Sequence, residues 1–270
     1  MSERHSAVGL AATGLGGGFF SGLTGVGGGA IMVPLMTGVL RMRQHTAHGT
    51  SLVVIIFAAA ASALVYQVRD GVNWGLVGVL LPASLVGAYV GARLVQFLPA
   101  MRLRQLFGAF VFVVGLRLLV VQSVDAIFDV HGAAEALLGG GIGLLGGVLS
   151  GALGVGGGAI FVPALVLLLG VDQHEAQGVS LCVIVGAAIT GALTHARHGS
   201  MDTAAAKWIA PLAVPAGIGG ALVASWLDGD VLQRIFAVVL VLVGTQMFAT
   251  ATRNLRRTRA EAAATEGASA

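Results

Sequence analysis

Apolar segments separated by short polar loops make up most of this chain. A helix needs about 20 mainly apolar residues to cross a lipid bilayer. Three segments in each half have about that length, and they predict single transmembrane helices over residues 46–67, 73–98, 103–122, 175–196, 203–227 and 231–252. The first apolar segment of each half, residues 7–40 and 136–169, is too long for a single crossing.

A glycine-rich interruption divides both of these long segments. Residues 21–36 read SGLTGVGGGAIMVPLM and residues 150–165 read SGALGVGGGAIFVPAL, with 11 of 16 positions identical at an offset of 129. The same offset aligns most of the sequence that follows. The chain is therefore predicted to consist of two homologous transmembrane repeats, residues 7–122 and 136–252.

Composition places the chain among polytopic, all-α membrane proteins. It is 56% hydrophobic and 10% charged, whereas soluble domains are roughly 25% charged. The start lacks the pattern of a cleavable signal sequence, so the first apolar segment is expected to stay in the protein. The polar, Ala-rich residues 253–270 predict a disordered cytoplasmic tail. We assign the basic character to arginines placed by membrane topology, so no nucleic acid is expected as a partner.

The positions of Lys and Arg, which are enriched in cytoplasmic loops, predict how the two long segments lie. Segment 7–40 begins near Arg4 and ends at Arg41, so both of its ends belong inside. Residues 118–196 contain no Lys or Arg, and the loops on both sides of segment 136–169 are acidic, so both of its ends belong outside. Each long segment is thus predicted to be a re-entrant helical hairpin that enters and leaves by the same face.

This interpretation gives two inverted-topology repeats, each a re-entrant hairpin plus three transmembrane helices, with both termini cytoplasmic. The alternative is eight spans with kinked first helices, which would make the repeats parallel.

The glycine motifs would form the tips of the two hairpins. Irregular backbone at membrane depth is tolerated only where it is buried in protein or lines a polar cavity. The helices predicted to follow, from near Ala30 and Ala159, point their N-termini at the tips, and helix N-termini favour anions. Two such tips could form one anion site near the midplane. Alternatively, the glycines only allow close helix crossing.

The candidate substrate-binding residues are the tip glycines and three polar side chains: Gly25, Gly27, Gly28, Gly29, Ser51, Gly154, Gly156, Gly157, Gly158, Ser180 and Arg117. The two serines match across the repeat and could donate to a ligand, or bond back to a helix carbonyl. Arg117 is a charge close to the apolar part of a span, which could instead extend to the membrane interface.

The sequence carries no carboxylate pair, Cys/His metal cluster, nucleotide loop or nucleophile triad. We therefore expect no enzyme activity, no cofactor and no metal.

The duplicated GVGGGAIMVP and GVGGGAIFVP motifs, in two homologous halves, make the chain resemble the sulfite exporter TauE/SafE family of membrane permeases. The resemblance covers nearly the whole chain. It implies transport of small sulfur-containing anions, such as sulfite, thiosulfate or an organosulfonate, across a prokaryotic inner membrane.

The main hypothesis is a secondary transporter that binds a small, sulfur-containing oxyanion between the two tips and alternates access by movement of the halves. A coupling ion, H⁺ or Na⁺, and an oligomeric state are both open. The alternatives are a passive anion channel built from paired re-entrant half-helices, and a membrane enzyme or accessory subunit, against which the missing catalytic groups argue.

Overall fold

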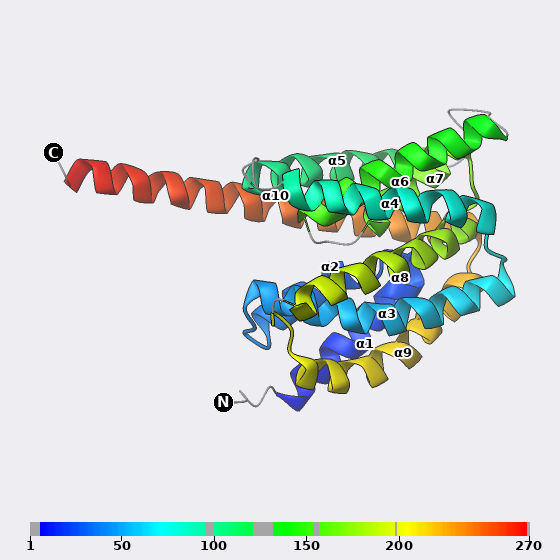
Figure 1. The fold of residues 1–270 in the computed structure, drawn as a ribbon, viewed down its shortest axis with the longest axis horizontal. Coiled ribbons are helices and arrows are strands. Elements are labelled where there is room, and N and C mark those ends of the chain that lie inside the picture. Colours follow the sequence, from blue (N-terminus) through cyan, green and yellow to red (C-terminus); the bar gives the residue numbers. More distant parts are fainter. Residues whose placement is uncertain (1–5, 95–99, 121–131, 154–156, 198, 269–270) are drawn as a thin grey trace.

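The computed structural model describes residues 6–94, 100–120, 132–153, 157–197 and 199–268. These residues form ten helices and no strand, as the hydrophobic pattern predicts. The helices are α1 (Ala7–Thr24), α2 (Gly29–Gly38), α3 (Gln44–Arg69), α4 (Trp74–Leu94), α5 (Ala100–Val120), α6 (Ala133–Leu153), α7 (Gly158–Leu169), α8 (Gln173–Arg197), α9 (Thr203–Trp226) and α10 (Gly229–Ala268). Figure 1 shows them as one bundle from which the end of α10 projects.

Seven of the described helices are long and apolar enough to cross a membrane. They include α1 and α6, the first arms of the predicted hairpins, and leave out α5, whose apolar stretch Gln105–Val120 is shorter. Large apolar side chains also cover the outside of the bundle, among them Leu106, Val113 and Val238. A surface of this kind suits lipid and would be unusual on a soluble monomer.

Helices α1 and α2 form an antiparallel hairpin. Gly9 of α1 faces Leu40, just beyond α2, and Gly17 faces Met32. Segment 7–40 therefore folds back on itself. Helices α6 and α7 pair at the equivalent position, where Gly146 faces Phe161.

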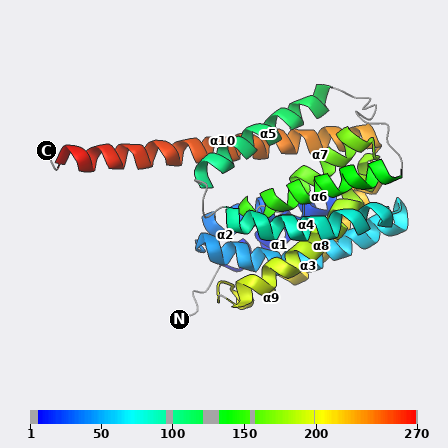
Figure 2. The ribbon, with the colours of Figure 1, turned by 45° about the horizontal axis from the view of Figure 1, so that its top comes forward.

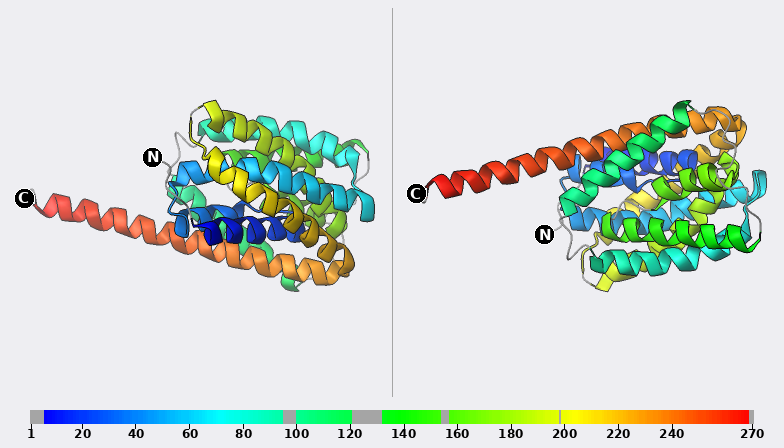
Figure 3. Two further views of the ribbon diagram at one scale, coloured as in Figure 1. Left: turned by 90° about the horizontal axis from the view of Figure 1, so that it is seen from below. Right: turned by 90° about the horizontal axis from the view of Figure 1, so that it is seen from above.

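The equivalent helices of the two repeats pack antiparallel to each other. In the α3–α8 pair, Gly49 lies against His195, and its repeat equivalent Gly178 lies against Tyr66. In the α5–α10 pair, Gly108 faces Met247 near one end of the pair. The three ribbon views agree that α5 runs alongside α10 (Figures 1, 2 and 3).

Each hairpin packs against a long helix of the other repeat: α1 against α9, and α6 against α4. A Cβ added to Gly22 of α1 would lie 2.0 Å from the Gly217 oxygen of α9, and one on Gly91 of α4 would lie 2.0 Å from the Val148 oxygen of α6. Only glycine allows such close backbone contact. The helices α4 and α9 start after equivalent capping side chains: Asn73 Oδ1 accepts from Leu76 N, and Asp202 Oδ1 from Ala205 N. The two halves are thus interlocked.

These directions define two ends of the bundle. The basic end comprises residues 39–43, 197 and 199–203 with the starts of α1 and α5. The acidic end comprises residues 69–74, 169–173 and 226–230 with the start of α6. In the described ranges, every Lys and Arg lies at or beyond the basic end except Arg69, Arg117 and Arg234. The first hairpin opens to the basic end and the second to the acidic end.

The structure differs from the sequence prediction at the C-terminus. Helix α10 continues through residues 253–268, where a disordered tail was expected. Ala, Arg and Glu fill most of this stretch, and all three have high helix propensity. A helix already formed in α10 extends readily into such a sequence, because propagation is easier than nucleation.

Candidate functional site

The first glycine motif turns the chain sharply between α1 and α2. Gly25 ends α1 with φ +69°, and Gly27 and Gly28 have φ +86° and +70°. Residues with a Cβ rarely adopt this left-handed region. The repeated glycines are therefore required by the shape of the tip, as well as by the space around it.

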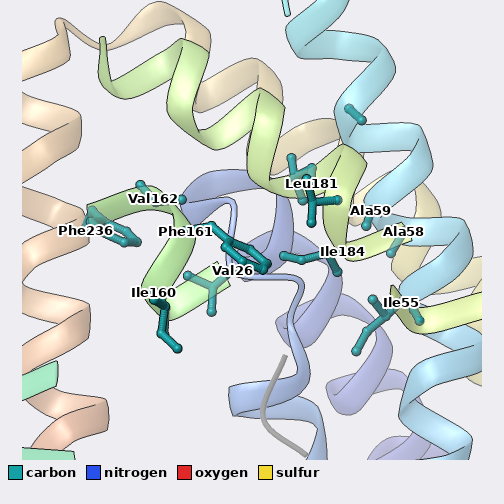
Figure 4. Close-up of a cluster of buried hydrophobic side chains, with 14 of the residues drawn as sticks. Val26, Ile55, Ala58, Ala59, Ile160, Phe161, Val162, Leu181, Ile184 and Phe236 are labelled. Carbon is teal, nitrogen blue, oxygen red and sulfur yellow. The ribbon is translucent and has the colours of Figure 1, made fainter. Parts of the chain in front are cut away.

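The two glycine tips meet inside the bundle. A Cβ added to Gly158, the first residue of α7, would lie 2.6 Å from Val26 Cα and 2.8 Å from the Gly25 oxygen. The side chain of Ile184, near the middle of α8, lies next to both Gly27 and Gly158. Figure 4 shows Val26, Phe161 and Ile184 together at this contact. The structure thus brings the first tip and the start of α7 into direct contact.

The short helices α2 and α7 both begin at this contact and run to opposite ends of the bundle. The first turn of a helix has N–H groups without intrahelical partners and a partial positive charge. Two such N-termini converge here, in a region where the glycines, Val26 and Ile184 are buried. The arrangement favours a small anion.

The two motifs have the same GVGGG sequence but different backbones. Gly157, which precedes α7, has φ −73°, whereas the equivalent Gly28 has φ +70°. Gly154 and Gly156 lie outside the described residues. The equivalent glycines that precede α2 and α7 therefore differ in backbone conformation.

Of the three polar side chains predicted to bind the substrate, not all lie at the glycine tips. Ser180 is fully buried and donates to the Gly25 oxygen at 2.8 Å, which ties α8 to the first tip. Its single proton is used in that bond, so in this conformation Ser180 offers a ligand only lone pairs. Ser51 is buried and donates to the His48 oxygen of its own helix at 2.9 Å. Arg117 is exposed near the acidic end of α5 and is not brought to the tips.

Two polar residues that sequence reasoning did not consider, Ser21 and Tyr66, lie at the first tip together with Gln177. The Tyr66 hydroxyl contacts both the Gly22 oxygen, at 2.9 Å, and the Gln177 amide. The side chains of Ser21 and Gln177 are fully buried, and Ser21 Oγ and one amide atom of Gln177 have no hydrogen-bond partner among the described residues. Buried polar atoms without partners are uncommon, because each costs about 1–3 kcal/mol.

The sequence does contain a signal for Ser21 and for Gln177. Ser21 is the first residue of the repeated motif, and Gln177 lies three residues before Ser180, on the same face of a helix.

A second polar cluster joins α8 to α9 at the acidic end. His174 Nδ1 lies 3.2 Å from Asp172 Oδ1, and Nε2 lies 3.1 Å from the Ala224 and Leu227 oxygens. The hydrogen bond with His174 lowers the pKa of Asp172 below its ordinary value, and burial raises that of Asp70 nearby. Within the described residues, no three His, Cys, Asp or Glu side chains are grouped to hold a metal ion.

Comparison with known proteins identifies the family to which this architecture belongs. The sequence model described as "Sulfite exporter TauE/SafE" matches residues 1–118 and 139–269. The chain belongs to the TauE/SafE family of membrane transporters.

Curated relatives agree with this family. The "Probable membrane transporter protein YunE" of Bacillus subtilis is 28% identical over 269 residues, covering 90% of this chain and 97% of the relative. A "Probable membrane transporter protein" of Xylella fastidiosa strain Temecula1 is 27% identical over 231 residues, covering 84% and 88%. The TauE/SafE chain is thus a multi-pass membrane transporter, and these relatives' names give no substrate.

Proposed function

We propose that this transporter carries a small, sulfur-containing oxyanion and binds it between the two glycine tips. The observation that carries the proposal is the convergence of the α2 and α7 N-termini at the contact between Gly158 and Val26. Backbone N–H groups in the first turns of α2 and α7 would supply the donors, apart from those, such as the N–H groups of Gly29 and Ile160, which already donate to the Gly27 and Gly157 oxygens. A site of this kind binds an anion through dipoles and hydrogen bonds without a charged side chain.

The sulfur chemistry rests on the family, whose printed description is a sulfite exporter. A binding screen of the purified protein by thermal shift tests it, with sulfite, thiosulfate, sulfoacetate, sulfate and phosphate as ligands. Stabilisation by one or more of the sulfur oxyanions, with phosphate weaker, is the expected result. Stabilisation by none of the five would refute the proposed substrate class.

We further propose that the repeats are inverted with respect to the inner membrane, with the basic end in the cytoplasm. The opposite openings of the two hairpins and the concentration of Lys and Arg at one end support this orientation. Reporter fusions at Gln173 and Ala204 test it, because these residues start helices at opposite ends. A periplasmic signal at Gln173 and a cytoplasmic one at Ala204 are expected. A cytoplasmic signal at Gln173 would contradict the inverted arrangement.

Access to the tips would alternate by exchange between two mirror-like arrangements of the repeats. Equivalent positions differ in burial: Pro34 of α2 is exposed and Pro163 of α7 is buried, and Gln44 is exposed whereas Gln173 is 4% exposed. This asymmetry supports a state that is closed toward the acidic end and more open toward the basic end. The reverse asymmetry would describe the other state.

A further inference from the structure

The first tip also contains oxygen atoms that an anion site does not explain. They lie at the C-terminal end of α1, where helix carbonyls carry a partial negative charge. Ser21 and Gly25 are one helical turn apart and share a face of the chain, and Gly25 packs directly against the Cβ and Cγ of Gln177. Ser21 also contacts Gly28, where its Cβ lies 3.2 Å from the position of an added Cβ, so Ser21 and Gln177 both border the first tip.

The hydrogen bonds around Tyr66 decide which end of the Gln177 amide is unpartnered. The Tyr66 hydroxyl has one proton but lies within hydrogen-bond distance of two oxygens, Gly22 O and Gln177 Oε1. A backbone carbonyl can only accept, so the proton belongs to Gly22 O. Turning the amide by 180° lets its NH₂ donate to the Tyr66 oxygen and satisfies both contacts; the amide N and O are assigned from such networks. The carbonyl oxygen of Gln177 is then the atom without a partner.

Ser180 also contributes an oxygen atom that can only accept. Its proton is donated to the Gly25 oxygen, so its own oxygen presents only lone pairs. The buried groups at the end of α1 thus offer oxygens: the side chains of Ser21, Gln177 and Ser180, and the Gly25 carbonyl, which has a second lone pair. The Ser21 hydroxyl can also donate, but the other three groups present only lone pairs, and these suit a cation better than an anion.

We propose that these four oxygens bind a small monovalent cation such as Na⁺ at the C-terminal end of α1. All four ligands are neutral, which suits a monovalent ion better than Ca²⁺, whose sites use carboxylates. The positive charge would be balanced by the α1 C-terminus and by the oxyanion at the adjacent N-termini of α2 and α7. A broken helix that places a cation at one half and an anion at the other is a recognised transporter arrangement.

The site has a consequence for coupling, and this part rests on the proposed anion site. A cation and an anion held on two sides of one glycine turn attract each other, so each should increase the affinity for the other. By linkage the factor is the same in both directions. The cation therefore becomes the coupling ion, without any intramembrane carboxylate to carry a proton.

Thermal stability of the purified protein tests the site, in NaCl, KCl and choline chloride at equal ionic strength. An alkali cation that binds the folded state raises the melting temperature with concentration, and choline is too large to enter. Ser21→Ala and Gln177→Leu should each raise the cation concentration for half-maximal stabilisation about tenfold, roughly the loss of one ligand contact. Ser84→Ala is the matched control, because Ser84 is a buried serine bonded to the Leu81 oxygen of α4, on another part of the bundle.

Equal melting temperatures in all three salts would overturn the cation site, as would an unchanged alkali-ion response in both Ser21→Ala and Gln177→Leu. The anion screen is read separately, first in choline chloride and then in the alkali salt that stabilises the protein most. Stabilisation by sulfite in choline chloride without any Na⁺ or K⁺ effect would remove the cation site and leave the proposed function intact. A Na⁺ or K⁺ effect without any anion effect would support the cation site and remove the proposed substrate.

Discussion

Gly158→Ala separates the two tips without straining the backbone. The added Cβ would lie 2.6 Å from Val26 Cα and 2.8 Å from the Gly25 oxygen, whereas ordinary contacts begin at 3.4 Å. The first tip must therefore move by about 0.8 Å. Both neighbours are backbone atoms, so no change of side-chain rotamer relieves the contact. Gly158 does not have a positive φ, so strain from that source does not contribute.

Three contributions determine the free-energy cost of Gly158→Ala. Overpacking of this kind costs about 1–3 kcal/mol. A tip displaced by this amount also weakens the Ser180–Gly25 hydrogen bond, worth about 1 kcal/mol, while the higher helix propensity of Ala returns up to about 1 kcal/mol. The variant should therefore lose about 1–3 kcal/mol of stability at the tip contact. A fraction of that loss, about 1.4 kcal/mol, corresponds to a tenfold weaker anion affinity.

The assay is titration of the purified variant with the oxyanion found in the screen, together with its melting temperature. We expect a folded protein with anion affinity reduced at least tenfold. Gly78→Ala of α4 is the control, because its added Cβ meets nothing within 4 Å, and it should keep wild-type affinity. Wild-type affinity in Gly158→Ala would refute the role of the tip contact.

Three further predictions concern the same framework. Ser180→Ala removes the 2.8 Å bond to the Gly25 oxygen and should lower stability by about 1 kcal/mol, measured by thermal unfolding in detergent; a smaller loss than in Ser84→Ala would contradict this role. In a Cys182→Ala background, a cysteine at the exposed Gln44 should react with a membrane-impermeant maleimide from the cytoplasmic side, whereas one at the buried Gln173 should not react from either side; equal labelling would exclude the asymmetric state. Asp172 has a lowered pKa in the folded protein, so its contribution should be complete above its unfolded value of about 3.9 and be lost as pH falls through the folded value. The melting temperature of wild type should therefore exceed that of Asp172→Asn by more at pH 6 than at pH 3, and a difference independent of pH would contradict this.

The hydrophobic and charge patterns were sufficient to predict the apolar helices and the hairpin formed by α1 and α2, but not the helical continuation of α10 through residues 253–268. The GVGGG break is visible in sequence because five small residues interrupt a long apolar run, and glycine adopts the positive φ values of Gly25, Gly27 and Gly28 more readily than residues with a Cβ. The contact between the tips could be anticipated from the repeat, since hairpins that open in opposite directions bring their turns together.

The polar network of the first tip could not be predicted in the same way. Tyr66 and Gln177 are 111 residues apart, on α3 and α8. Their contact depends on how closely the two helices cross, and that is set by Gly178 against the Cβ of Tyr66. A single sequence also gives no reason for Gly28 and Gly157 to differ in φ, because their neighbours are the same.

Anion counterflow through the purified protein tests the central claim, that one saturable site between the tips alternates across the membrane. Liposomes are loaded with the unlabelled oxyanion identified in the binding screen, and uptake of the radiolabelled anion is followed. The account predicts saturable uptake that is stimulated by the internal anion, retained in Gly78→Ala and lost in Gly158→Ala. The account would be contradicted by uptake that does not saturate, that is independent of the internal anion, or that is equal in the two variants.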